Sequence, residues 1–308
     1  MIVVSGDYGQ LGNRLIVYAN LIAGARQHGL RLANPAFHEY APYFETTRGD
    51  VWCRFPATGR SWFTGPRLRR WVHRGTFRAP RLVKKFRNRT GRWPPWVRVL
   101  DVGWHQPCNV DGPEFLALAR RPGFLIAKGW LFRAHASFAQ HADALRRFFT
   151  PIEIHRRKVA ALLARLRHAA DVVVGVHVRQ GDYRAFCGGR FFYDTRQYAN
   201  VLQGVTGLFA GQTVAFLLCS DTAQPAAAFA GLNVMFGTHH VVEDLYALAA
   251  CDYLIGPPST FSQWASFYGA VPRYVLVDPD ARPNRGDFAV THNFNAAAEE
   301  VSPVSAGV

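Results

Sequence analysis

The stretch that decides the fold is Val172-Val173-Val174-Gly175-Val176-His177-Val178-Arg179-Gln180-Gly181-Asp182-Tyr183. Its first part is apolar and rich in β-branched residues, which is typical of a buried parallel strand. At its end, polar and charged residues come in quick succession, and Gly181 lets the chain turn. In open α/β sheets, ligands bind beyond the carboxyl ends of the strands. Arg179 would offer a planar, charged fork that suits phosphate oxygens there, and an ordinary surface ion pair is the alternative.

The chain after this stretch alternates regularly between strand and helix patterns. We expect strands at 172–178, 214–219, 234–236, 252–256 and 273–277. We expect helices near 195–208, 225–229, 243–251 and 261–269. This rhythm predicts a parallel sheet covered by helices on both faces.

The first half is less regular. A short strand at 2–5 runs into a glycine-rich turn, and apolar residues then recur at helical spacing from Leu11 until the helix ends near Gly29. The glycines follow GxxGxxG rather than GxGxxG, and no acidic residue closes the next strand, which disfavours dinucleotide binding. We expect 37–109 to be irregular.

Three elements are expected before the second half begins. They are a strand at 122–128, a helix at 137–149 that Ser137 caps, and an amphipathic helix at 152–169. The contrast in regularity predicts two domains that meet at a cleft, 1–151 and 152–308.

Positive charge is concentrated in one segment, about 51–100. Between Asp50 and Asp101 lie 14 Lys or Arg and no Asp or Glu, so this segment carries nearly all of the net charge of +15. Nine aromatic residues are interleaved with the cations. The pattern fits an anionic membrane surface better than nucleic acid. A coding bias is the third interpretation, since Arg outnumbers Lys 32 to 4, but it does not explain the missing acids.

Composition points to an intracellular protein. No run of 18 apolar residues is present, and the N-terminus has no basic region of a signal peptide. The five cysteines are scattered, without a CxxC pair, which suggests reduced thiols and disfavours a zinc site. We expect a cytoplasmic protein with peripheral contact to the inner membrane through residues 51–100.

Three further loops carry residues suited to a nucleotide. Ser220 and Asp221 follow the strand at 214–219, and Ser259 and Thr260 begin the helix at 261–269. A helix N-terminus offers free N–H groups and partial positive charge to a phosphate, although Ser259 could equally serve as a plain N-cap. Asp244 could accept from a guanine ring N–H and amine, or it could be an ordinary acid in the first turn of a helix.

Five elements, in order, resemble the bacterial α-1,2-fucosyltransferases. The stretch 9–15 is similar to their GGLGNQ element, and 177–183 to their HVRRGDY element. The stretch 129–151 is similar to the sequence before that motif, and 218–221 to their FSDD-like strand end. The stretch 244–264 is similar to their final D…C…SSFSWW block. Together these elements cover most of the chain apart from about 35–120.

The resemblance implies an α/β fold of the GT-B type, with two Rossmann-like domains, a parallel sheet in each and a cleft between them. It implies an inverting, metal-independent enzyme that moves L-fucose from GDP-fucose to a glycan hydroxyl, without a cofactor. The donor would bind the C-terminal domain. In the only candidate DxD, Asp278-Pro279-Asp280, the proline is typical of a turn.

The resemblance also implies residue roles. Arg179 would bind the β-phosphate, Asp244 would bind guanine, Ser259 and Thr260 would hold the diphosphate, and His177 would line the nucleotide pocket. Ser220 and Asp221 would contribute to the donor site. Asn13 would face the sugar and acceptor, with Gly12 and Arg14 beside it. Asp182 is the nearest candidate for a general base, although an Asp after Gly more often holds its own loop in place.

Some residues depart from the family pattern. Gln180 replaces the second arginine of HVRRGDY, Arg14 replaces a glutamine, and Gln263 stands where a tryptophan is usual. These changes leave two alternatives open. One is a transferase that uses a different nucleotide sugar on the same fold. The other is a non-catalytic protein that binds glycans or polyanions on a decayed transferase scaffold.

Overall fold

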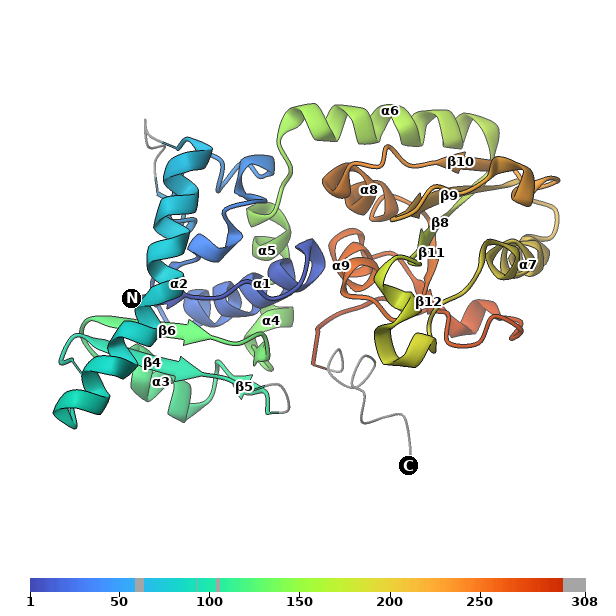
Figure 1. The fold of residues 1–308 in the computed structure, drawn as a ribbon. Coiled ribbons are helices and arrows are strands. Elements are labelled where there is room, and N and C mark those ends of the chain that lie inside the picture. The colour runs from blue at the N-terminus through green and yellow to red at the C-terminus, as the bar shows by residue number, and fades with distance from the viewer. Residues whose placement is uncertain (59–63, 93, 104–105, 296–308) are drawn as a thin grey trace. The chain divides into compact units, whose positions relative to one another are not determined.

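The computed structural model describes residues 1–58, 64–92, 94–103 and 106–295. The chain divides into two compact units, Met1–Ile152 (unit 1) and Glu153–Val308 (unit 2). Each unit has its own sheet and helices (Figure 1). In the described residues, no helix is long and apolar enough to cross a bilayer.

Unit 1 is built on a five-stranded sheet with the order β3-β2-β1-β6-β4. Its strands are β1 (Ile2–Val4), β2 (Leu32–Ala33), β3 (Arg54–Phe55), β4 (Val97–Asp101) and β6 (Phe124–Lys128). All neighbours pair in parallel except β2 and β3. A small second sheet pairs β5 (Cys108–Asn109) with β7 (Phe132–Arg133) in parallel.

The helices of unit 1 are α1 (Leu11–Gln27), α2 (Pro66–Thr90), α3 (Pro113–Ala119), α4 (Ser137–Gln140) and α5 (Ala142–Phe148), with short 3-10 turns η1 (Pro35–Phe37) and η2 (Ala41–Tyr43). Helix α1 lies in the core, because most of its residues from Leu11 to Ala25 are buried. Tyr18 from α1 packs against the rings of Phe37, Phe148 and Phe149 at centroid distances of 5.3 to 5.4 Å. This aromatic cluster joins the two ends of the unit's sequence.

The expectation of an irregular segment at 37–109 is wrong. It contains β4 and the 25-residue helix α2. The sequence did not predict this helix because Gly75, Pro80 and many cations interrupt its apolar pattern. The pattern is a helical stripe formed by Leu68, Val72, Thr76, Ala79 and Val83. These residues are buried or half-buried, whereas most of their neighbours are exposed.

The expected helix at 137–149 is also corrected. It is two helices, α4 and α5, that are separated at His141. Ser137 does not cap either of them, because its hydroxyl donates to the Asp111 carboxylate at 2.7 Å.

Unit 2 is built on five parallel strands with the order β10-β9-β8-β11-β12. The strands are β8 (Val172–Val178), β9 (Val214–Ser220), β10 (Val234–Phe236), β11 (Tyr253–Gly256) and β12 (Arg273–Val275). The helices are α6 (Glu153–Ala169), α7 (Thr195–Thr206), α8 (Val241–Leu248) and α9 (Thr260–Gly269), with 3-10 turns η3 (Asp182–Arg184), η4 (Phe186–Gly189), η5 (Gly207–Phe209), η6 (Ala226–Phe229) and η7 (Arg285–Asp287). The predicted parallel sheet of the second half is confirmed.

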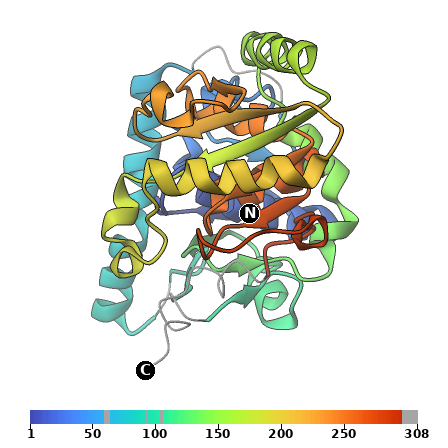
Figure 2. The ribbon, with the colours of Figure 1, turned by 90° about the vertical axis from the view of Figure 1, so that its right-hand side faces the viewer.

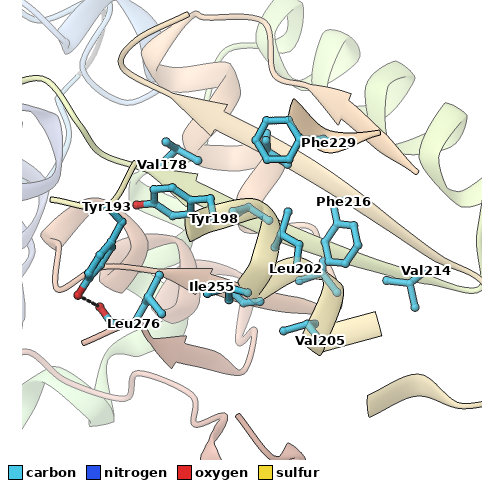
Figure 3. Close-up of a cluster of buried hydrophobic side chains, with 14 of the residues drawn as sticks. Val178, Tyr193, Tyr198, Leu202, Val205, Val214, Phe216, Phe229, Ile255 and Leu276 are labelled. Carbon is cyan, nitrogen blue, oxygen red and sulfur yellow. Dashed lines mark hydrogen bonds between the residues drawn. The ribbon is translucent and has the colours of Figure 1, made fainter. Parts of the chain in front are cut away.

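Helices cover both faces of this sheet. Helix α7 lies against one face, and Figures 1 and 2 show α6 and α8 on the other. All seven residues of β8 are buried, as its apolar sequence predicts. On α7, Tyr198, Val201, Leu202 and Val205 recur at helical spacing and pack on the strands (Figure 3). The Tyr193 hydroxyl closes the cluster by donating to the Leu276 carbonyl at 3.1 Å.

Arg69 fixes α2 to the rest of unit 1. Its side chain is buried, and its guanidinium donates to the carbonyls of Thr47, Arg48, Asp50 and Thr64 at 2.7 to 3.1 Å. A planar fork with five donors can satisfy several loop carbonyls at once, which a lysine cannot do. The 44–53 loop and the first turns of α2 are therefore held by one side chain.

We predict that Arg69→Ala destabilises unit 1 by about 2–4 kcal/mol, because it leaves buried carbonyls without donors. Urea unfolding of the purified variants measures this loss. The matched control is Arg70→Ala, which removes an exposed cation from the next position and should change the free energy of unfolding by less than about 0.5 kcal/mol. Equal effects of the two substitutions would contradict the assignment.

Candidate active site

The strand order of unit 2 indicates where its ligand site lies. From β8 the chain builds outward through β9 and β10, and it then returns to build β11 and β12 on the other side. The order reverses between β8 and β11, which are paired neighbours. Crevices at the carboxyl ends of strands at such a switch point are the usual ligand sites of open α/β sheets. Arg179 follows β8, and Ser259 follows β11.

Arg179 is held in place by two carboxylates. Its Nε and Nη2 contact the two oxygens of Asp182 at 2.9 and 3.0 Å, and its Nη1 lies 3.3 Å from Asp221 Oδ2. The guanidinium also lies 5.8 Å from the ring centroid of Tyr183. Its side chain is 17% exposed, whereas that of Asp182 is 61% exposed. The fork is thus pre-oriented, and an exposed carboxylate occupies two of its donors.

Asp182 is placed here as the ion-pair partner of Arg179. The bidentate geometry is the one that guanidinium forms with a carboxylate or a phosphate. An anionic ligand could therefore displace the exposed Asp182 from Arg179 by offering oxygens in the same arrangement. This contact gives Asp182 a direct role in orienting Arg179.

Asp221 holds the turn after β8. Its carboxylate accepts from the backbone N–H groups of Gln180 and Gly181 at 2.9 and 3.1 Å. A Cβ at Gly181 would lie 2.9 Å from Asp221 Oδ2, so the carboxylate approaches the turn closely because position 181 is a glycine. Asp221 therefore links the ends of β8 and β9, and its contact with Arg179 fixes the guanidinium relative to both strands.

Gln180 and Ser220 belong to a polar network beneath this turn. Gln180 is buried, donates to the Tyr193 carbonyl at 2.9 Å, and accepts from Thr222 and Gln224 at 2.8 Å each. Ser220 Oγ accepts from Thr222 N–H and Gln224 Nε2, both at 3.2 Å. The residue at the position of the family's second arginine is thus a buried amide that supports the loop. Ser220 has its contacts within the same network.

His177 lies inside the unit rather than at its surface. Its ring is buried 4.9 Å from the Phe261 ring, and Nδ1 has no hydrogen-bond partner among the described residues. Burial, together with the positive charges of Arg179 and Arg273, lowers the pKa of His177 from 6.5 to about 3. The imidazole is therefore neutral at physiological pH, and it supports the crevice through packing.

Ser259 and Thr260 open α9 at the same switch point. Ser259 is the N-cap, and its Oγ accepts from Phe261 N–H at 3.2 Å. The Tyr183 hydroxyl donates to the carbonyl of Pro258, which ties the Arg179 loop to this helix start. Thr260 is half-exposed. The N-terminus of α9, which carries the positive end of a helix dipole, and the guanidinium thus belong to one connected set of loops.

Asp244 lies at the carboxyl-end side of β9 and β10. It is buried, and Oδ1 accepts from Thr238 N–H at 2.7 Å and from Thr238 Oγ1 at 3.3 Å. Its other oxygen, Oδ2, has no hydrogen-bond partner among the described residues. Burial raises the pKa of Asp244, and the hydrogen bonds from Thr238 oppose that rise. One oxygen is therefore committed to the loop, and one is left for a ligand donor.

Gly12, Asn13 and Arg14 belong to unit 1, in the first turn of α1. The Arg14 side chain is only 12% exposed and donates to the carbonyls of Gly9 and Ala36 at 3.2 and 3.0 Å. It also pairs with Glu39 at 3.0 Å. A Cβ at Gly9 would meet Asn13 Nδ2, so the turn packs closely on Asn13. In this structure the Arg14 side chain holds its own loop together, and Gly12 is buried.

Sequence reasoning missed two histidine clusters. Asp7, His38 and His73 form one, and His155, His240 and Glu243 form the other. The two imidazoles in each cluster stack, with centroids 4.3 and 4.5 Å apart and ring planes only 12° and 26° from parallel. Nitrogen lone pairs lie in the ring plane, so stacked rings do not direct them at one ion. Neither arrangement suits a metal ion.

No family model matches the chain, and no curated protein matches it. Solved structures do match. A mutant of Arabidopsis thaliana FUT1 in complex with GDP aligns with 94% of this chain and 73% of that chain, at 15% identity and a TM-score of 0.61. Fucosyltransferase NodZ from Bradyrhizobium aligns with 91% and 96%, at 18% identity and 0.54. NodZ alpha-1,6-fucosyltransferase soaked with GDP-fucose aligns with 91% and 97%, at 19% identity and 0.52. These likenesses confirm the predicted α/β fold of the GT-B type.

We predict that His177 makes unit 2 sensitive to acid. Folding lowers the pKa of His177 from 6.5 to about 3. Between these two pH values the imidazole is protonated in the unfolded chain and neutral in the folded chain. Stability therefore falls as pH drops from about 6.5 towards 3, by about 2 kcal/mol at pH 5 from this group, and does not change above 6.5. Comparing urea unfolding of the wild type and His177→Gln at pH 7 and pH 5 isolates the effect. Identical pH dependence in both proteins would contradict it.

Proposed function

We propose that the protein is a glycosyltransferase that moves L-fucose from GDP-fucose to a hydroxyl of a glycan acceptor. The observation that carries this proposal is the fixed guanidinium of Arg179, in a loop that Tyr183 ties to the start of α9, at the switch point of an all-parallel sheet. Positive charge in that place suits a diphosphate. Similar solved structures that hold GDP or GDP-fucose support the choice of nucleotide.

The residues present can perform the chemistry. As the bond to the sugar breaks, charge develops on the departing diphosphate. Arg179 and the free N–H groups at the start of α9 would stabilise that charge, because both are already in place before reaction. Asp221 would keep the guanidinium oriented while the exposed Asp182 gives way to phosphate oxygens. Neutral His177 would pack under the loop without adding charge.

The remaining details of the proposal come from the family resemblance. They are inversion at the anomeric carbon, transfer without a metal ion, and a linkage of the α-1,2 type. Asp244 would accept from guanine through the oxygen that Thr238 does not use. Ser259 and Thr260 would contact the diphosphate.

Nucleotide binding tests the proposal directly. We expect GDP to bind more tightly than UDP or ADP in calorimetry, with no change on adding EDTA. Arg179→Ala should weaken GDP binding about a hundredfold, because it removes a charge-assisted contact with phosphate. The matched control is Arg196→Ala, an exposed cation on α7, which should have no effect.

Three outcomes would overturn parts of this function. Tighter binding of UDP than of GDP would argue for a different nucleotide sugar and against Asp244 as the guanine contact. Unchanged GDP binding in Arg179→Ala would refute the central contact. Binding of glycans or polyanions without any transfer or hydrolysis of GDP-fucose would favour the non-catalytic alternative.

We further propose that α2 brings the protein to an anionic membrane surface. Cations recur at every third or fourth position along its exposed face, and they have no acidic partner among the described residues: Arg67, Arg70, Arg74, Arg78, Arg81, Lys85 and Arg89. Trp71 and Leu82 flank them, with 73% and 65% of their surface exposed. A basic helix with exposed aromatic and aliphatic side chains suits the headgroup region of a bilayer better than the grooves of nucleic acid.

Vesicle sedimentation tests this contact. The wild type should bind vesicles that contain phosphatidylglycerol and not vesicles of neutral lipid. Replacing Arg70, Arg74 and Arg78 together by Gln should weaken binding about a hundredfold, at roughly 1 kcal/mol per cation. The control replaces Arg156, Arg165 and Arg196, which are exposed on unit 2, and has the same net charge. Equal losses in both triple variants, or preferential binding to duplex DNA, would contradict a membrane role for α2.

A further inference from the structure

Unit 1 has a cavity at its own switch point. From β1 the chain builds β2 and β3 on one side, whereas β6 and β4 lie on the other, so the strand order reverses between β1 and β6. A cavity of about 270 Å³ opens beyond these two strands, lined by the loop after β1, the last residue of β6 and one side of α2. The volume is near the lower end for a small-molecule pocket, about 300 Å³.

Helix α2 forms the roof of this cavity. Ser5 Oγ donates to the Thr76 carbonyl at 2.9 Å, and Asp7 Oδ2 lies 3.0 Å from His73 Nε2. These two contacts join consecutive turns of α2 to the loop after β1. Arg69 also fixes the start of α2. The helix is therefore anchored at several points along one side of the cavity, and the cavity is preformed.

The apolar side of the lining suits a sugar ring. Tyr8 and Phe77 face the cavity from the loop and the helix, and Phe77 is 43% exposed. Aromatic faces can pack against the C–H groups of a pyranose while polar neighbours bind its hydroxyls. Asp7 provides such a neighbour. Burial would raise the pKa of Asp7, but the hydrogen bond and charge of His73 and the charge of Arg14 outweigh it and hold the pKa below the usual value. The carboxylate is therefore ionised and can accept from hydroxyls.

The polar side of the lining carries an excess of positive charge. Lys84 and Lys128 both contact Asp101, at 2.9 and 3.0 Å, so one carboxylate is shared between two ammonium groups. Arg81 also lines the cavity, and it has no acidic partner among the described residues. Binding of a neutral glycan does not require an unpaired guanidinium in the lining. An anionic group on the ligand would pair with Arg81 through a charge-assisted hydrogen bond.

We propose that this cavity binds the glycan acceptor and that the bound glycan carries a carboxylate or phosphate, which Arg81 recognises with Lys84 and Lys128. The acceptor assignment rests on the proposed function, and it names the class of substrate for that function: an acidic glycan. The binding of an acidic sugar in unit 1 can be measured without the donor.

The experiment measures binding of matched disaccharides to the full chain by calorimetry or ligand-detected NMR. The probes are a neutral disaccharide, its uronic acid counterpart, its 6-phosphate counterpart, and inorganic phosphate alone. We expect both acidic disaccharides to bind at least about tenfold more tightly than the neutral one, and free phosphate to bind far more weakly than either. Comparing the two acidic probes shows which anion is preferred.

Two variants locate the binding site. Arg81→Gln should remove most of the preference for acidic disaccharides. Arg78→Gln is the matched control, because it removes an exposed cation one turn earlier on the same helix, at a residue that does not line the cavity. Equal effects of both variants would show a general effect of charge and would overturn the proposal. Equal binding of acidic and neutral probes, binding of phosphate alone as tight as that of the acidic sugars, or no binding of any probe would also overturn it.

The same samples separate this inference from the proposed function. Arg81→Gln should leave GDP affinity unchanged. If GDP fails to bind while acidic disaccharides bind through Arg81, the transferase assignment fails and the cavity stands as an acidic-glycan site. If GDP binds through Arg179 while the acidic probes show no preference, the cavity assignment fails and the transferase assignment stands.

Discussion

The parallel direction of the central strands determines where chemistry can occur in this protein. Parallel strands bring their carboxyl ends to one edge, and a reversal in strand order opens a crevice there. In unit 2 the reversal falls between β8 and β11, which places Arg179 and the start of α9 at one crevice. In unit 1 it falls between β1 and β6, and a cavity lies beyond the same two strands. Both candidate sites follow from the same geometric constraint.

Within the crevice of unit 2, the two acids that pair with Arg179 differ in what holds them. Asp221 is partly buried and accepts two backbone hydrogen bonds, so its position is set by the protein. Asp182 is mostly exposed, and an ion pair in contact with water contributes little to stability. In the proposed function, a phosphate would therefore replace Asp182 at small cost while Asp221 continues to orient the guanidinium. The two acids thus keep the Arg179 guanidinium ordered when no ligand is bound, and the exposed position of Asp182 leaves the guanidinium accessible to an anion.

The sequence predicted unit 2 well because its signals are local. The β-branched run of β8 predicts a buried strand, and all seven of its residues are buried. Gly181 lies in the expected turn, where it also leaves room for the Asp221 carboxylate. The sequence could not show which polar residues hold the loop and which remain available. Ser220 and Gln180 lie in a network with Thr222 and Gln224 that depends on contacts up to 44 positions apart. Such partners are set by tertiary packing, and composition does not reveal them.

Helix α2 is the element that the sequence did not predict. It lies in the strongly basic segment, where the sequence pattern indicates irregular structure. Its buried stripe is narrow, and Pro80 and Gly75 oppose a helix locally. Tertiary contacts outweigh them, because buried Arg69 and the bridge from Asp7 to His73 tie the helix to loops far away in sequence. These anchors also separate the cations of α2 by role. Arg69 is buried inside the unit, Arg81 and Lys84 line the cavity, and the other exposed cations of the helix keep the charge that a bilayer would meet. A segment without acidic residues can therefore stabilise a fold through one buried cation and still leave positive charge at the surface.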